Sequence, residues 1–348
     1  MGAPPGATSH TFAELGMRTV TTLLGCVRSL LLTPSLAEVS FAGRGFPVTA
    51  SDATRALEAI PQSVVCGFEW GIAARDQWEL ERRLALVEPE LRGFAYEGAT
   101  MAFTVRDAMA GGRGRRTRDL LNGSGQRHIF LAYIGIGFAM ARLPRPLWRK
   151  VIPDLAGSPY HPTMSWLAVD GYGFDRAYFD TDRWVGEQWR PAPYPWAGWP
   201  EYFPRAVDQG IGRALWFIHG GHVGDVGAAV GRFAGERQAD LWSGVGLAAT
   251  FAGGCGPQDL AALRRAAGSY RADLGQGAVF AAKARDYAGY VPRHSAVAVS
   301  ALADLSIEAA SVLADDVALE GLDSDTAPPY EVWRARVRSS LAVAKSST

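Results

Sequence analysis

The sequence predicts a mainly α-helical protein built on an internal duplication, in which two blocks of about one hundred residues pack with pseudo-twofold symmetry. Three observations lead to this prediction. Apolar residues recur at helical spacing along much of the chain. Glycine-containing stretches recur in the same order in the two blocks, and a segment rich in proline and aromatic residues separates them.

Length and composition are those of a globular protein with a sizeable core. The chain has 348 residues, of which 48% are hydrophobic and 20% are charged. The 35 basic side chains balance the 35 acidic ones, which argues against a nucleic-acid partner because such binding relies on excess Lys and Arg. The longest apolar runs, 129–141 and 245–252, are short of the roughly 20 residues that span a bilayer. We therefore expect buried helices and not an integral membrane protein.

The three cysteines, Cys26, Cys66 and Cys255, form no CxxC pair. Neither a disulfide framework nor a cysteine zinc site is indicated, and a reducing cytoplasm is the expected setting. The sequence shows no Walker loop, no GxSxG elbow and no dinucleotide-binding fingerprint. We therefore predict no cofactor and no metal.

Residues 1–90 are predicted to form an N-terminal helical segment. Apolar spacing predicts a helix over 12–32. The stretch 49–52 is a typical helix start, and Pro61 is expected to end that helix because proline lacks the N–H of a helix interior. Residues 78–87 place Leu on one face and Glu and Arg on the other, which indicates an amphipathic helix.

The two predicted blocks are residues 91–185 and 205–300, and each contains three glycine landmarks on apolar helical runs. The gaps between successive landmarks are 37 and 36 positions in the first block, and 34 and 33 in the second. A coincidence or a looser helical pattern is the alternative to a duplication. In order along the chain, the landmarks are Gly98, Gly135, Gly171, Gly210, Gly244 and Gly277.

Residues 186–204 connect the blocks, and 301–348 are predicted to add C-terminal helices. The prolines of 189–204 exclude a helix interior, and the Trp and Tyr residues indicate an ordered connector over the surface or across a cleft mouth. Residues 321–329 read as a polar loop, followed by a short amphipathic helix over 330–343.

Four polar residues that precede landmark glycines are the candidate site. If the blocks pack about a twofold axis, Glu97 and Asp170 face Gln209 and Gln276 across the interface. A carboxyl in an apolar cavity has a raised pKa and can act as acid or base. We predict Glu97 and Asp170 to be catalytic; helix capping or bonding to neighbouring backbone is the alternative. The residues predicted to bind substrate are Gln209, Gln276, Trp216, Trp242 and Tyr172.

Other polar motifs are weaker. His219 and His222 have HxxH spacing, but we expect a turn after a helix rather than a metal site. Asp315, Asp316 and Glu320 faintly resemble a diphosphate motif, and a solvated helix end is expected.

Two groups of basic residues are also expected at the surface. One comprises Arg113, Arg115, Arg116 and Arg118, which read as an exposed loop with an anionic partner as the alternative. Lys283 and Arg285 share the helix of Gln276, and holding an anionic group is the alternative for them.

Several stretches together carry a family resemblance: FAGRGF at 41–46, FAYEG at 94–98, WLAVDGYGF at 166–174, DQGIGRALW at 208–216, DLWSGVG at 240–246 and QGAVFAAKAR at 276–285. They resemble a bacterial family of unknown function, the UnbL-like proteins of enediyne polyketide biosynthesis cassettes (domain-of-unknown-function family 1702). The resemblance runs from about 41 to 302.

The resemblance implies a cytoplasmic role in antibiotic biosynthesis, beside an enediyne polyketide synthase. The implied ligand is a hydrophobic linear polyene or polyyne, which an apolar cavity between the blocks would isomerise, dehydrogenate or cyclise. A non-catalytic polyene carrier, or a scaffold for other cassette proteins, is the alternative. A homodimer is left open. The family brings no assigned catalytic residues, so the candidate site rests on the sequence pattern.

Overall fold

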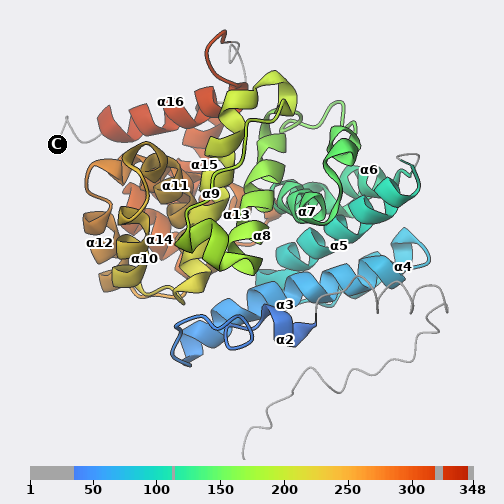
Figure 1. Ribbon diagram of the computed structural model, residues 1–348, viewed down its shortest axis with the longest axis horizontal. Coiled ribbons are helices and arrows are strands. Elements are labelled where there is room, and N and C mark those ends of the chain that lie inside the picture. The colour runs from blue at the N-terminus through green and yellow to red at the C-terminus, as the bar shows by residue number, and fades with distance from the viewer. Residues whose placement is uncertain (1–34, 112–113, 318–323, 344–348) are drawn as a thin grey trace, which may run out of the picture.

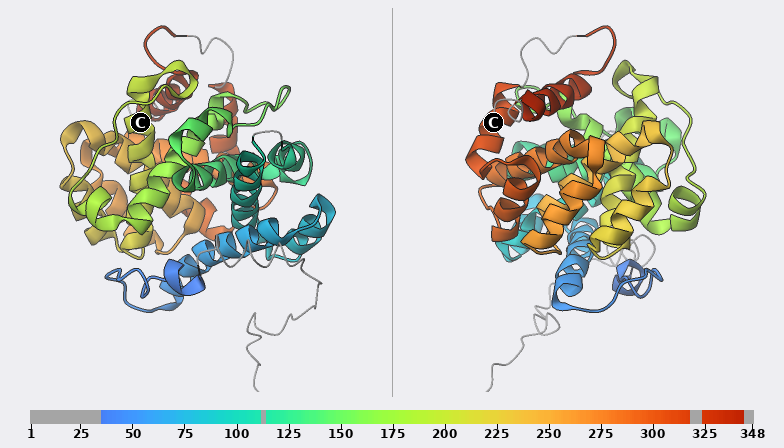
Figure 2. Two further views of the ribbon diagram at one scale, coloured as in Figure 1. Left: turned by 45° about the vertical axis from the view of Figure 1, so that its right-hand side comes forward. Right: turned by 90° about the vertical axis from the view of Figure 1, so that its left-hand side faces the viewer.

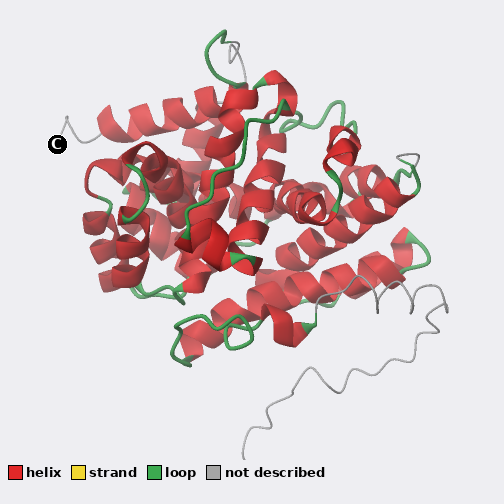
Figure 3. Cartoon of the chain, viewed as in Figure 1, coloured by secondary structure: helices red, strands yellow, loops and turns green. Residues whose placement is uncertain are grey.

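The computed structural model describes residues 35–111, 114–317 and 324–343. These ranges consist of helices and connecting loops and contain no strand (Figure 3). The predicted mainly α fold class is therefore confirmed. The helix predicted over 12–32, Arg113 and Glu320 lie outside the described residues.

The α-helices are, in chain order, α2 (Leu36–Val39), α3 (Asp52–Ala73), α4 (Gln77–Ala85), α5 (Pro89–Met109), α6 (Arg116–Asn122), α7 (Ile129–Arg142), α8 (Leu167–Phe179), α9 (Phe203–Ile218), α10 (Val223–Gly231), α11 (Gly235–Ala252), α12 (Pro257–Ala266), α13 (Arg271–Ala288), α14 (Arg293–Ala303), α15 (Ile307–Asp316) and α16 (Pro329–Val343). Short 3-10 turns join several of them, including the connector before α9, in which Trp196 and Tyr202 are buried.

The start of α3 agrees with the sequence, but its end does not. Ser51 caps the helix, and its side chain accepts a hydrogen bond from the backbone N–H of Thr54 at 3.1 Å. The prediction that Pro61 ends this helix is wrong, because α3 continues to Ala73. A proline inside a helix costs about 3 kcal/mol. Burial of apolar residues on both sides of Pro61, Leu57 and Val65 among them, offsets that cost.

Seven of the described helices, α3, α5, α7, α8, α9, α11 and α13, form the centre of the molecule, and each packs against the next. In Figure 1, α3 (blue) runs along the lower edge, α8 and α9 cross the middle, and α16 (red) lies across the top. Figure 2 shows the same arrangement from two other sides, with α2 and its loop below α3. The core therefore follows the order of the chain.

Glycines bring these helices into backbone contact. A Cβ on Gly135 of α7 would overlap the carbonyl oxygen of Glu97 on α5, and a Cβ on Gly137 would overlap that of Ala168 on α8. The first glycine of the pair thus contacts the preceding helix and the second contacts the following one. Any larger residue would force the helices apart. The same relationship holds for Gly171 and Gly173, Gly210 and Gly212, and Gly244 and Gly246.

The glycine pattern has a period of one helix. All six landmark glycines contact the preceding core helix, and Gly98 begins the series against Val64 of α3. The recurrent spacing therefore arises from one repeated helix crossing. This crossing explains the landmarks without two blocks, so the duplication, its pseudo-twofold axis and its boundaries stay predictions.

Within the described ranges, no single helix has the length and apolar character needed to cross a membrane. One pair, α14 and α15, passes the same criteria jointly but is bent by 64° at its break.

Candidate functional site

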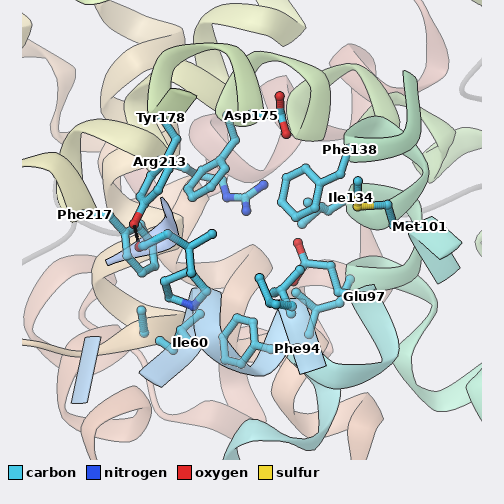
Figure 4. A pocket seen from close by; sticks show the side chains of 18 of the residues that line it. Ile60, Phe94, Glu97, Met101, Ile134, Phe138, Asp175, Tyr178, Arg213 and Phe217 are labelled. Atoms are coloured by element: carbon cyan, nitrogen blue, oxygen red, sulfur yellow. Dashed lines mark hydrogen bonds between the residues drawn. The ribbon is translucent and has the colours of Figure 1, made fainter. Parts of the chain in front are cut away.

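A cavity of about 80 Å³ lies between α3, α5, α7, α8, α9 and α11 (Figure 4). Its wall is mostly aromatic and aliphatic, and we call it the central cavity. The acidic and basic side chains on its wall are Glu97, Arg142, Asp175 and Arg213. The larger apolar residues around them include Ile60, Phe68, Phe94, Met101, Ile134, Phe138, Phe174, Phe217 and Phe251.

Glu97 points into the central cavity, toward the guanidinium of Arg213 (Figure 4). Its helix, α5, is held against α7 by the crossing at Gly135. The residue is only 2% exposed, and within the described ranges its carboxyl makes no hydrogen bond or ion pair. Burial raises the pKa of Glu97 to about 8, with Arg213 opposing the shift and Asp170 adding to it. The carboxyl is therefore mainly protonated at neutral pH.

Asp170 engages the guanidinium that Glu97 faces. Arg213 of α9 forms an ion pair with Asp170 of α8, and both side chains are buried. Gln209 donates a second hydrogen bond from Nε2 to Oδ2 of Asp170 at 2.8 Å. Burial raises the pKa of Asp170, and the positive charge of Arg213 acts against that rise. Asp170 thus fixes Arg213 beside the cavity but does not line it.

Gln276 belongs to a neighbouring polar cluster away from the cavity wall. Its Oε1 accepts hydrogen bonds from Ser243 Oγ at 2.8 Å and from Arg334 Nε at 3.1 Å. Arg334, on α16, is fully buried and pairs with Asp240 at 2.7 Å. The structure therefore joins Asp170 directly to Gln209, places Glu97 beside their ion pair, and keeps Gln276 apart.

The three aromatic residues predicted to bind substrate are buried but do not line the central cavity. Trp216 donates from Nε1 to the carbonyl of Gly253 at 2.8 Å. Tyr172 packs edge-on against Trp148, with ring centroids 4.9 Å apart. Trp242 is 3% exposed. That these three residues bind substrate stays a prediction, and none of them is part of the wall of this cavity.

The segment 39–48 meets the cavity at Val39. Val39 lies in the cavity wall, and its carbonyl accepts a hydrogen bond from Tyr178 Oη at 2.6 Å. Arg44 donates to the carbonyl of Phe179 at 2.7 Å and to that of Tyr178 at 3.1 Å. These bonds tie the segment to the end of α8. Beside it, Asp175 and Arg142 pair at 2.6 Å.

Sequence reasoning missed Arg213 and the contribution of α16. Arg213 stands alone as a charge in the apolar run of α9, four residues after Gln209 on the same helix face. That interruption was a usable signal. Tyr330 gave no such signal in the sequence. Its hydroxyl lies 3.0 Å from Gln209 Nε2, but the two residues are 121 positions apart.

The HxxH motif and the arginines near residue 116 have structural roles or lie at the surface. His222 caps α10 and lies 2.8 Å from Asp225, as expected of a turn. Among the described residues, no group of three His, Cys, Asp or Glu side chains is placed to hold a metal. Arg116 and Arg118 pair with nearby acidic residues at the surface.

The expected surface placement of Lys283 and Arg285 is wrong. Lys283 is 8% exposed and Arg285 is 3% exposed. Lys283 pairs with Asp315 at 2.7 Å. Arg285 donates to the backbone carbonyls of Glu90 at 2.9 Å and Phe251 at 2.6 Å. Other helices supply these partners, and the ion pair with Asp315 makes burial of the Lys283 cation tolerable.

No curated protein and no solved structure is significantly similar to this chain. One family model matches residues 23–341, which includes every core helix and the cavity. Its description is that of a protein of unknown function, DUF1702. The chain therefore belongs to the DUF1702 family.

Proposed function

We propose that this protein binds a linear polyene in the central cavity and moves a proton on it, as an accessory enzyme of enediyne biosynthesis. The polyene and the pathway rest on the family resemblance. The chemistry rests on one observation, the buried Glu97 carboxyl directed into an apolar cavity, where burial raises its pKa to about 8. An acid whose pKa lies near the working pH is suited to proton transfer.

The proposed reaction is an isomerisation or a cyclisation without net oxidation. The Glu97 carboxyl donates its proton to one carbon of the conjugated chain, which leaves a delocalised cation. The resulting carboxylate takes a proton from another carbon, either directly or after ring closure, and the acid is restored. Arg213 stabilises the transient carboxylate, because it already faces that side chain. Asp170 and Gln209 act as positioning residues for Arg213.

The present size of the cavity bears on how such a ligand enters. A cavity of about 150 Å³ accommodates benzene, whereas the central cavity measures about 80 Å³. A long polyene therefore requires the cavity to widen. The segment 39–48 is the proposed moving part, since a few hydrogen bonds from Arg44 and Tyr178 hold it to α8.

The test is Glu97→Gln, produced together with the synthase and followed by mass spectrometry of the products and of the purified protein. Glu236→Gln, on the exposed start of α11, is the matched control. We expect Glu97→Gln to retain bound polyene and to lose the product that wild type and control form. Wild-type product from Glu97→Gln would refute the catalytic role.

A carrier that sequesters the polyene is the second candidate. The apolar wall of the cavity favours it, because binding alone needs no acid. Unchanged products from Glu97→Gln, with polyene still bound to the purified protein, would assign this role.

A further inference from the structure

A second cavity of about 450 Å³, with both polar and apolar side chains on its wall, lies next to the central one. Leu131 and Phe251 line both cavities. The guanidinium of Arg285 lies over the ring of Phe251 at 3.9 Å and reaches the polar side. The two spaces therefore adjoin at these two residues.

Three arginines line the second cavity, Arg92, Arg127 and Arg285, and among the described residues no Asp or Glu lines it. Two acidic side chains act on its lining residues from outside, Glu81 on Tyr96 and Glu90 on Arg285. Glu81 accepts from Ser124 at 2.8 Å, and the Glu90 carboxylate lies 3.5 Å from His294.

Arg285 is the most telling member of this group. It is 3% exposed, and in the described ranges it forms no ion pair. Both of its described hydrogen bonds go to backbone carbonyls, and its buried Nε has no partner. A buried cation without a counter-ion is costly unless something compensates for it. Burial lowers the pKa of Arg285 to about 10, and the charge of Glu90 opposes that shift only in part.

The positive charges of the same three arginines also act on His128. Burial and then the charges of Arg92, Arg285 and Arg127 lower its pKa to about 4. Its ring stacks on Tyr96 at 4.5 Å, and its buried Nδ1 has no partner among the described residues. A neutral imidazole N–H and three guanidinium groups together form a donor set that suits an oxyanion.

We propose that the second cavity binds the oxyanion head of the ligand whose apolar chain occupies the central cavity. The ligand class is then an unsaturated chain that ends in a carboxylate, or one carried on a phosphate-containing arm. Phe251 and Leu131 would turn aside to let the chain pass toward Glu97. This inference rests on the proposed function for the identity of the chain, but its test measures binding and not turnover.

The test uses cis-parinaric acid, a fluorescent conjugated fatty acid, and its methyl ester, which lacks the charge. We expect wild type to bind the acid more tightly than the ester. Arg127→Met and Arg285→Met should each weaken binding of the acid by about 10- to 100-fold and leave the ester nearly unaffected. Arg264→Met, which removes a charge remote from both cavities, should change neither.

Arg285→Met can fail to fold because Arg285 is buried, so circular dichroism and Tm accompany each titration. Arg127 is exposed and keeps the test decisive. Equal affinity for acid and ester in wild type, or a preference for the acid that survives Arg127→Met and a folded Arg285→Met, would overturn the proposal.

Competition with a polyenyl phosphopantetheine thioester distinguishes the two sources of the oxyanion. Stronger competition than by the free acid identifies the phosphate, and weaker competition identifies the carboxylate. Glu97→Gln is also titrated with the acid and the ester. If this variant loses the reaction but keeps the preference for the acid, or keeps the reaction but loses that preference, the oxyanion site and the proposed chemistry are separate properties.

Discussion

Glu97 and Arg213 face each other across the central cavity without forming an ion pair, because Asp170 engages the guanidinium from the other side. One positive charge is therefore balanced by one carboxylate, and the second carboxyl keeps its proton. Ionising Glu97 would leave a net negative charge in an apolar enclosure. This arrangement makes Glu97 a pH-sensitive group of the cavity near neutral pH.

Glu97→Gln is expected to change how stability depends on pH. The pKa of Glu97 is about 8 in the folded protein, against an ordinary value of 4.5. The stability that the protonated carboxyl provides is complete below about pH 4.5 and is lost as the pH rises to about 8. Between these two pH values, the free energy of unfolding of the variant should rise by on the order of a few kcal/mol relative to that of wild type. Urea unfolding at pH 5 and pH 8.5 measures this, and a pH-independent difference would contradict it.

The proposed reaction should fail at alkaline pH. If the Glu97 carboxyl donates the proton, kcat/KM falls as the pH rises through about 8, because the acid form disappears. A pH–rate profile with the purified polyene measures this. A rate that is constant from pH 7 to 9.5 would exclude Glu97 as the donor.

Breaking the buried ion pair should be costly. Arg213→Met leaves Asp170 buried without its counter-ion, and we expect a loss of about 3 to 5 kcal/mol in the free energy of unfolding. Asp170→Asn combined with Arg213→Met should recover part of that loss. Asp52→Asn, which breaks the exposed pair with Arg55, is the control and should cost at most about 1 kcal/mol. Equal losses at the two sites would contradict this picture.

The helix crossings should tolerate glycine alone. A Cβ at Gly210 would overlap the carbonyl oxygen of Asp170, so Gly210→Ala should destabilise the protein by about 1 to 3 kcal/mol or more. Gly231, at the end of α10, has open space where the methyl group of an alanine would lie. Gly231→Ala should therefore be neutral or stabilising by up to about 1 kcal/mol. Thermal unfolding compares the two variants. An unchanged Tm for Gly210→Ala would show that the helices can move apart without loss of stability.

Arg44→Ala should loosen the segment beside the cavity. The substitution removes two hydrogen bonds to the carbonyls of Tyr178 and Phe179. We expect faster amide hydrogen exchange in 39–48 and faster entry of an apolar fluorescent ligand, with exchange in α11 and α13 unchanged. Exchange followed by mass spectrometry measures the first effect. Unchanged exchange in 39–48 would show that other contacts hold this segment.

Much of the helical framework was predictable because the signals are local. The predicted helix 330–343 agrees with α16 to within one residue. The prediction that the helix ends at Pro61 was wrong because packing along the whole of α3 outweighs the local cost of the proline. The four polar residues predicted as the candidate site are all buried, since each directly precedes a glycine that marks a close crossing.

The site itself was only half predictable. Glu97 and Asp170 could be chosen from the sequence, but which of them is paired could not. That outcome depends on how α9 is rotated against α8, which brings Arg213 to Asp170. Likewise, the burial of Arg285 depends on carbonyl groups of Glu90 and Phe251, which α5 and α11 supply.

By itself, the sequence determined the helical class, most helix positions and the glycines at which helices meet, because periodicity and close packing act between near neighbours on one helix. Tertiary structure alone decided which carboxyl stays protonated, which cations are buried and where the two cavities lie. Those properties follow from the distances between charges on different helices and from the water excluded between them.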